Sequence, residues 1–386
     1  MSDDDEARPA RAAISVRGGG RARARHMHLA RARCRWQLQL AASADQLMML
    51  ATTLLLGLVP AGHAAPNASP LKVFVLAGQS NMEGQAEVSK VCTSVEPGKC
   101  DKVGSEMNGT LKYQLSDPRT AAEFAPCWDQ GAKNWTVLSD VKIWFNEKGK
   151  VPAVPGCPLG CPADLQSGTY GDMSIGFGVG GHTNMAERPH IGPEYGFGFA
   201  MHDAMKGEPI LIVKTAWGGK TLCGDFLPPS SVNATNNKTT GFYYKQMMQY
   251  VANILAPANL TKLFPEFQGK TTQIVGFGWD QGWNDGCGVA CTDEYEHNSA
   301  CRSVAAILVA QPCREHVLTC VGGANCLVVV NLIGDLRKAW NNPQLAISIP
   351  VSGFGGWGQT NARRLGIIDA QFGACNTTRH PGMTHC

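Results

Sequence analysis

Residues 71–82 read LKVFVLAGQSNM, a continuous apolar run that ends at a glycine and continues into a polar segment. An unbroken run of β-branched and other apolar residues is typical of a strand buried on both faces of a parallel sheet. Gly78 permits a tight exit from that strand, and Ser80 is placed to open the next helix. The stretch therefore predicts the first strand of an α/β sheet.

The rest of the chain repeats this alternation. Further β-rich runs occupy residues 209–217, 273–279 and 345–351, and helical patterns occupy residues 195–205, 243–255 and 328–340. Strands that alternate with helices predict a mostly parallel sheet covered on both faces. Two stretches interrupt the pattern, residues 88–190 and residues 287–326, and both are expected to be surface insertions held by disulfides.

The charge balance excludes one class of protein. The chain has 386 residues with 34 basic and 31 acidic side chains, and the nine arginines and five acidic residues of positions 1–65 account for the positive balance. Residues 66–386 then carry 25 basic and 26 acidic side chains. A body of nearly neutral charge is not expected to bind nucleic acid.

The N-terminal region has the composition of a targeting segment. Residues 1–47 contain an arginine-rich run without lysine, which predicts a disordered or mis-annotated leader. Residues 48–65 join about a dozen apolar residues to a run of small residues, a signal-peptide pattern too short to span a bilayer. A buried core helix is the alternative for this run. Residues 66–386 are then expected to form a single domain.

Two further features agree with secretion. Glycosylation triplets occur seven times; they begin at Asn67, Asn108, Asn134, Asn233, Asn237, Asn259 and Asn376. Of 15 cysteines, 14 follow the expected cleavage site, and this density favours disulfides in an oxidising compartment. The spacing of Cys157 from Cys161, and of Cys287 from Cys291, also leaves a zinc site open as the alternative. We expect a secreted, disulfide-bonded glycoprotein without a stable membrane anchor.

Ser80 is the candidate nucleophile. Loops converge at the carboxyl ends of parallel strands, and Ser80 lies just beyond the first of them. A serine at the start of a helix has an exposed hydroxyl and a backbone N–H near the positive helix end, which suits a reaction that forms an oxyanion. A plain helix N-cap is the alternative, because serine is preferred there.

Two other strand ends add hydrogen-bond donors. The run 209–217 leads into Gly218 and Gly219, whose backbone N–H groups can approach a bound atom closely. The run 273–279 leads into Asn284, whose side-chain amide is another donor. Serine, glycine and asparagine at three neighbouring strand ends predict an oxyanion hole, although each glycine cluster alone is explained by a turn.

The motifs GQSNM (78–82), GPE (192–194), KTAWGGK (214–220) and WDQGWNDG (279–286) together resemble the SGNH, or GDSL-like, hydrolase superfamily. Within it the chain resembles the branch of sialate O-acetylesterases and acetyl xylan esterases, carbohydrate esterase family six. The resemblance implies a three-layer α/β/α sandwich with a flavodoxin-like sheet and no metal or organic cofactor. It implies that Ser80 is the nucleophile, that Ser80, Gly219 and Asn284 supply the oxyanion donors, and that Gln281 lines the acyl pocket.

The general base departs from the family pattern. The superfamily takes a histidine, often within D-x-x-H, from a loop after the last strand, and this chain contains no D-x-x-H. His380 and His385 are the only histidines at a suitable position. A C-terminally truncated sequence is the expected explanation.

The leading hypothesis is a secreted serine esterase that removes O-acetyl groups from a carbohydrate such as sialic acid or a xylan-like glycan. Tryptophans at or near the expected strand ends (Trp217, Trp283 and Trp357) suit a sugar face. The alternatives are a catalytically inactive glycan-binding protein of the same fold and a cysteine-based metal or redox protein.

Overall fold

The computed structural model describes residues 69–146, 168–179, 189–232, 238–287, 328–378, 380 and 383–386. The chain divides into two compact units, Met1–Ala65 and Pro66–Cys386, and all described residues belong to the second. The expected leader and signal peptide lie outside the described residues, as does nearly all of the cysteine-rich stretch 287–326.

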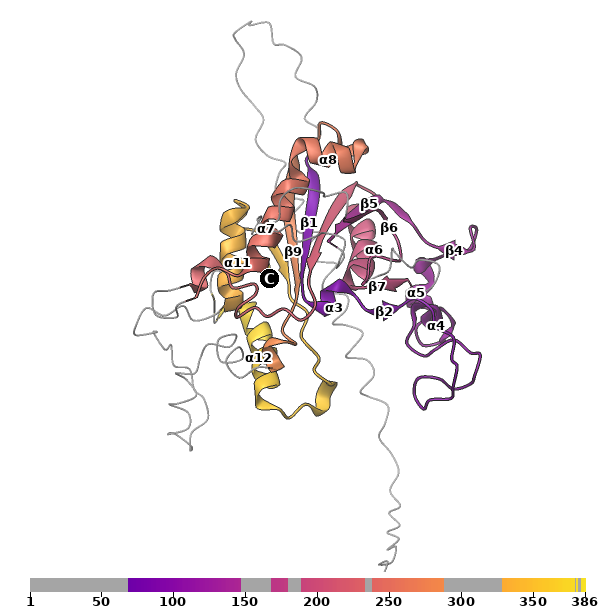
Figure 1. Ribbon diagram of the computed structural model, residues 1–386. Helices are drawn as coiled ribbons and strands as arrows, with labels where there is room; N and C mark the ends of the chain where they lie inside the picture. The colour runs from indigo at the N-terminus through magenta and orange to yellow at the C-terminus, as the bar shows by residue number, and fades with distance from the viewer. Residues whose placement is uncertain are drawn as a thin grey trace, which may run out of the picture. The chain divides into compact units, whose positions relative to one another are not determined.

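A six-stranded sheet lies at the centre of this unit (Figure 1), with the strand order β10-β9-β1-β8-β5-β6. The strands are β1 (Leu71–Gly78), β5 (Leu138–Phe145), β6 (Thr169–Met173), β8 (Ile210–Ala216), β9 (Thr272–Asp280) and β10 (Ala346–Ser348). Five strands run parallel, and only β6 pairs antiparallel with its neighbour. The mostly parallel α/β sheet predicted from the sequence is confirmed.

Helices cover both faces of the sheet, which makes three layers. One face packs against α7 (Phe242–Leu255), α8 (Pro257–Leu263), α11 (Val328–Ala339) and α12 (Ala362–Ala374), and the other packs against α3 (Ser80–Glu83) and α6 (Pro193–Met205). Residues of β1 alternate between the two cores: Val73 and Val75 belong to the first, and Leu76 to the second. This alternation follows from the period of two in a strand. The flanking helices therefore fix the sheet on both sides.

Local sequence explains where the helices begin and end. Pro193 is the first residue of α6, where its missing N–H costs nothing, and Lys206 ends the helix in the left-handed conformation. In α7, Met247, Val251 and Ile254 form a buried stripe at helical spacing. Both helices match their predicted positions to within two residues.

The structure corrects the expected surface insertion at residues 88–190. Within it, β5 lies in the sheet between β8 and β6, and Val141, Ile143 and Phe145 are fully buried. The charged residue Lys142 interrupts the apolar run of β5, so the segment lacks the continuous apolar pattern that predicts a buried strand. Its ammonium group pairs with Asp172 of β6 and Glu266, which explains how a charge is accommodated there.

The last strand is also shorter than predicted. The sequence predicted a strand over residues 345–351, whereas β10 ends at Ser348. Pro350 follows two residues later, and proline has no backbone N–H for a sheet hydrogen bond.

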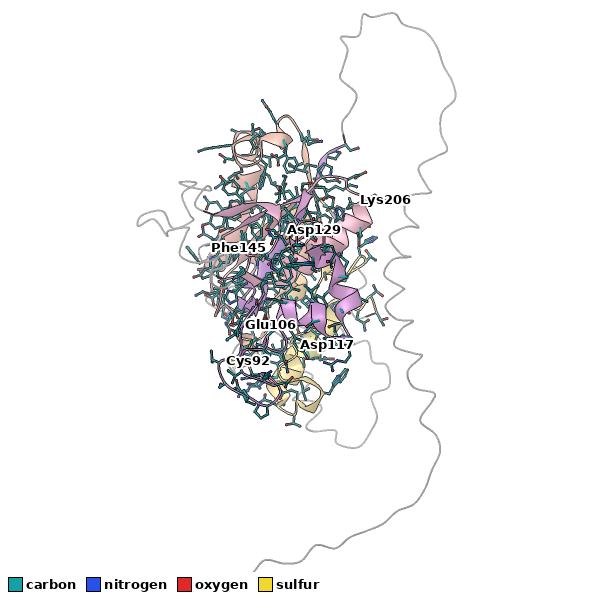
Figure 2. All side chains as sticks on the ribbon, turned by 90° about the vertical axis from the view of Figure 1, so that its right-hand side faces the viewer. Cys92, Glu106, Asp117, Asp129, Phe145 and Lys206 are labelled. Atoms are coloured by element: carbon teal, nitrogen blue, oxygen red, sulfur yellow. A yellow bond between two sulfur atoms is a disulfide. The ribbon has the colours of Figure 1, made fainter. Side chains whose placement is uncertain are left out.

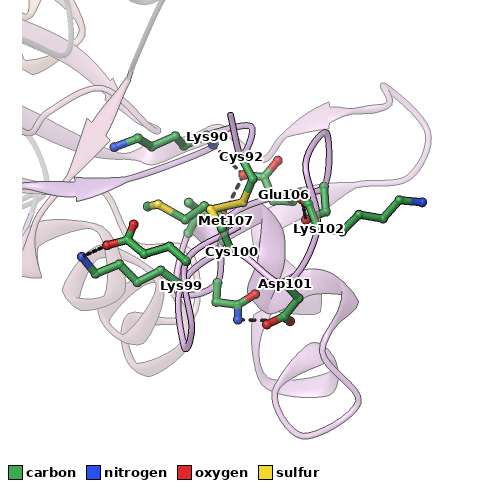
Figure 3. The surroundings of a disulfide bond; sticks show 12 residues. Lys90, Cys92, Lys99, Cys100, Asp101, Lys102, Glu106 and Met107 are labelled. Carbon is green, nitrogen blue, oxygen red and sulfur yellow. Dashed lines mark hydrogen bonds and ion pairs between the residues drawn. A yellow bond between two sulfur atoms is a disulfide. The ribbon is translucent and has the colours of Figure 1, made fainter. Parts of the chain in front are cut away.

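The first part of the 88–190 stretch is irregular, as expected, and carries a disulfide between Cys92 and Cys100. Figure 3 shows its surroundings, where the backbone N–H of Lys90 donates to the Glu106 carboxylate at 2.6 Å. Figure 2 is turned about the vertical axis of Figure 1, so heights agree between the views. Cys92 and Glu106 lie toward the lower end of this unit, the end at which β1 meets α3.

The described cysteines support disulfide formation. A second disulfide joins Cys375 to Cys386, and Cys223 is also disulfide-bonded. Cys127 is a buried free thiol, and Cys287 is an exposed one. The described residues contain no cluster of three or more metal-binding side chains. In the same part of the chain, no helix has the length and apolar character needed to cross a bilayer.

Candidate active site

The nucleophile candidate lies at the end of the central strand. After β1 the chain passes through Gly78 and the buried Gln79, and α3 begins at Ser80, which is half-buried. A Cβ on Gly78 would lie 2.1 Å from the carbonyl oxygen of Asp280, so only glycine lets β1 leave the sheet this close to β9. Since β8 and β9 flank β1 on opposite sides, Ser80 stands at a topological switch point.

Two segments meet beside Ser80. A Cβ built on Gly218 would lie 3.5 Å from the Cβ of Ser80, and one built on Gly219 would lie 3.8 Å from Nδ2 of Asn284. Gly219 has φ +76°, a left-handed conformation that favours glycine. The structure thus brings Ser80, Gly219 and Asn284 together at the carboxyl edge of the sheet, although they are more than 60 residues apart along the chain.

The Gln79 side chain joins the segment after β1 to the segment after β9 by hydrogen bonds. Its Oε1 accepts hydrogen bonds from the backbone N–H of Asn284 at 3.1 Å and of Gly282 at 3.3 Å. The residue is 1% exposed and directly precedes Ser80. Sequence reasoning did not assign it a role, although its place in the GQSNM motif was a signal that could have done so.

Gln281 is placed differently from the expected acyl-pocket residue. Its side chain is completely buried, and Nε2 donates to the carbonyl oxygen of Lys220 at 3.1 Å and to the carboxylate of Asp285. The same amide lies 3.4 Å from Oε1 of Gln79. In this structure the Gln281 side chain therefore contacts the neighbouring loops and not solvent.

Burial raises the pKa values of two carboxyl groups near the site. Burial raises the pKa of Asp280 to about 6, although a hydrogen bond with the Asn81 side chain opposes the rise. Burial also raises the pKa of Asp285 to about 6, against the opposing effect of hydrogen bonds from the Leu222 N–H, the Gln281 side chain and the Cys223 N–H.

A buried ion pair helps to fix the position of α3. The ammonium group of Lys214 on β8 lies 2.6 Å from Oε2 of Glu194, and both side chains are fully buried. The same ammonium donates to the carbonyl oxygens of Glu83 at 2.8 Å and Phe177 at 2.7 Å. Because Glu83 ends α3, Lys214 anchors the short helix that begins with Ser80.

Aromatic side chains border the Asn284 loop. Trp283 is 39% exposed and stacks on Phe354, with ring centroids 5.1 Å apart. The Arg364 guanidinium lies 5.8 Å from the Trp283 ring. Trp357 is fully exposed, whereas Trp217 packs against the core cluster of the α7 face. Of the three tryptophans proposed for a sugar face, Trp283 and Trp357 are the more accessible.

The structure places His385, one of the two candidate histidines, relative to the sheet. The carbonyl oxygen of His385 accepts from the N–H of Ile347 at 2.9 Å, so His385 lies beside β10. Ile347 is level with Phe277 and Val75, three residues before the end of β1, which is roughly 10 Å short of the carboxyl edge. The backbone of His380 bonds to Asn376. Among the described residues, no hydrogen bond or ion pair joins Ser80 to His385.

Comparison with known proteins gives no family for this chain and only weak structural likenesses. No protein-family model matches the chain, and no curated protein matches its sequence. Among solved structures, a protein from Arabidopsis thaliana has a TM-score of 0.38 at 15% identity and covers 79% of this chain and 82% of its own. A carbohydrate acetylesterase from Xanthomonas citri has a TM-score of 0.39 at 14% identity and covers 78% of this chain and 46% of its own.

The structure of NanS is similar at a TM-score of 0.35 and 14% identity, with coverage of 79% of this chain and 74% of its own. Likenesses at this level carry no weight for the function of this chain.

Proposed function

We propose that this protein is a serine esterase that removes O-acetyl groups from a carbohydrate through an acyl-enzyme. The observation that supports it is the meeting of Ser80, Gly219 and Asn284 at the switch point of the sheet. A hydroxyl beside backbone and amide N–H donors suits an acyl transfer in which negative charge develops on a carbonyl oxygen.

In this proposal Ser80 Oγ attacks the acetyl carbonyl carbon, and the hydroxyl proton passes to a general base. The carbonyl oxygen becomes an oxyanion held by the Ser80 and Gly219 backbone N–H groups and Nδ2 of Asn284. When the tetrahedral intermediate collapses, the sugar hydroxyl leaves with a proton and an acetyl ester remains on Ser80. Water then attacks that ester, releases acetate and restores the serine.

A carbohydrate substrate is supported by the exposed ring of Trp283, the residue directly before Asn284, since aromatic rings offer an apolar face to a sugar. We also propose that the protein enters the secretory pathway. The disulfides Cys92–Cys100 and Cys375–Cys386 support this placement, because disulfides persist mainly in oxidising compartments.

The decisive experiment compares the wild type with Ser80→Ala in hydrolysis of p-nitrophenyl acetate and of an acetylated glycan. Loss of the nucleophile is expected to lower kcat by several orders of magnitude while thermal unfolding stays the same. Ser116→Ala, at the exposed last residue of α4 (Leu111–Ser116), is the matched control and is expected to keep full activity. Equal activity of the wild type and Ser80→Ala would remove Ser80 from the mechanism.

A second candidate is a glycan-binding protein of the same fold without turnover. The position of His385 beside β10 favours it, because a serine with no adjacent base loses most of its reactivity, and among the described residues no hydrogen bond joins Ser80 to His385. This candidate predicts that the wild type and Ser80→Ala bind an acetylated glycan equally and that neither releases acetate.

A further inference from the structure

Three segments meet at the site, and they follow β1, β8 and β9. Asp285 joins the segment after β8 to the segment after β9. It follows β9 and is completely buried. Its Oδ1 accepts from the backbone N–H of Cys223 at 3.0 Å, and its Oδ2 accepts from the backbone N–H of Leu222 at 2.9 Å. These partners follow β8 and are 62 and 63 residues away along the chain. The carboxylate therefore bridges the segment after β8 and the segment after β9.

The bridge lies next to both proposed oxyanion donors. Asn284 directly precedes Asp285, and Gly219 lies three residues before Leu222. On the same carboxylate, the Nε2 group of Gln281 donates to Oδ2. That amide also donates to the carbonyl oxygen of Lys220, the residue after Gly219, at 3.1 Å. A shift that separated Gly219 from Asn284 would therefore also stretch these hydrogen bonds.

A carboxylate is a costly way to hold two loops together. Burial of an ionised group is unfavourable, and neutral side chains or backbone hydrogen bonds form ties at lower cost. What a carboxylate adds is acceptor capacity: two oxygens take several N–H donors at once in a fixed plane, and such charge-assisted bonds are short and strong. This choice is expected where the relative position of two loops has to be held closely.

We propose that Asp285 is the positioning residue of the oxyanion pocket, which clamps the 218–223 segment to the 281–286 segment so that the Gly219 N–H and the Asn284 amide point at one oxygen atom. The inference rests on the proposed esterase function. Asp285 itself touches no substrate. Its contribution appears in the transition state, because preorganised donors act on the charge that develops there.

The test is Asp285→Asn, which keeps the shape of the side chain and replaces one oxygen by an NH2 group. That group must replace either Oδ1, the acceptor for the Cys223 N–H, or Oδ2, the acceptor for the Leu222 N–H and the Gln281 amide, so in either orientation at least one donor loses its acceptor. With p-nitrophenyl acetate, kcat is expected to fall at least tenfold while KM stays within twofold. A wild-type kcat in a folded variant, or a change confined to KM, would overturn the inference.

Asp335→Asn is the matched control. Asp335 on α11 also accepts from a backbone N–H across elements, that of Ser230 at 2.8 Å, but it lies outside the three segments of the site. Its kcat is expected to stay within twofold of the wild type. An equal fall in both variants would assign the effect to general loosening of the structure and contradict the clamp.

Amide hydrogen exchange on the wild type tests the clamp without any variant. The Leu222 and Cys223 amides are expected to exchange as slowly as amides within β8, and Asp285→Asn is expected to speed both. Fast exchange at these amides in the wild type would refute the clamp, even if the variant fails to fold. The proposed function fails separately, if Ser80→Ala and the wild type hydrolyse the ester equally.

Discussion

At the scale of single residues, Asp280 links the site to pH. Burial raises its pKa to about 6, so between about pH 4 and pH 6 the folded protein holds a proton that the unfolded chain has released. The free energy of unfolding therefore falls as pH rises through this window, by up to about 3 kcal/mol from this group.

Asp280→Asn removes this contribution, and urea unfolding at pH 4.5 and pH 7 measures it. The loss of stability between the two pH values is expected to be smaller in the variant than in the wild type. Asp203→Asn, a change at an exposed carboxylate of α6, is the control and is expected to keep the wild-type difference. A variant with the same pH dependence as the wild type would contradict the effect of burial on Asp280.

The sequence allowed Ser80, Gly219 and Asn284 to be proposed because each follows a recognisable strand. Their supporting residues, Gln79 and Asp285, were missed for a physical reason. Most of their hydrogen bonds reach residues about 60 to 200 positions away, so a local motif can mark such a residue but does not report its partners. A carboxylate that accepts buried N–H groups reads, in the sequence, like any surface aspartate.

At the scale of elements, the placement of α3 depends on a buried ion pair under it. Lys214→Met removes the ammonium and leaves the Glu194 carboxylate buried without its cation. Loss of one partner of such a pair is expected to lower the free energy of unfolding by about 3–5 kcal/mol. Urea denaturation measures this change.

The matched control is Lys72→Met, since Lys72 pairs with Glu208 at 3.0 Å on the surface, where both side chains are partly exposed. Exposed pairs contribute about 0–1 kcal/mol, so this variant is expected to unfold close to the wild-type midpoint. An equal fall in the free energy of unfolding in the two variants would show that burial does not increase the contribution of the Lys214 pair to stability.

The elements also show where pattern reading works. The strands of residues 71–77, 209–217 and 273–279 were predicted within a few residues, because their side chains are buried on both faces and leave long apolar runs. β5 was missed because Lys142 interrupts its apolar run, and that charge is neutralised by partners far away in the sequence.

At the scale of the whole molecule, the Cys375–Cys386 disulfide joins the end of α12 to the segment beside β10. It closes a loop with a sequence separation of 11, and the chain-entropy model assigns such a loop about 2–3 kcal/mol of stability. Cys386→Ser is expected to lower the free energy of unfolding by this amount.

The proposed esterase activity is expected to be the same in Cys386→Ser and the wild type below the melting temperature, because the bond lies away from the carboxyl edge of the sheet. Cys287→Ser, which changes an exposed free thiol, is the control for stability and is expected to unfold like the wild type. A destabilisation of less than about 1 kcal/mol in Cys386→Ser would contradict the entropic contribution of the loop.

The three N–H groups that meet the single side-chain oxygen of Gln79 have a consequence for protein engineering. Replacing the loop after β9 by that of another α/β protein would introduce N–H groups that do not match the position of the Gln79 oxygen. A successful graft would have to include both the loop after β1 and the loop after β9, because Gln79 of the first accepts hydrogen bonds from the second.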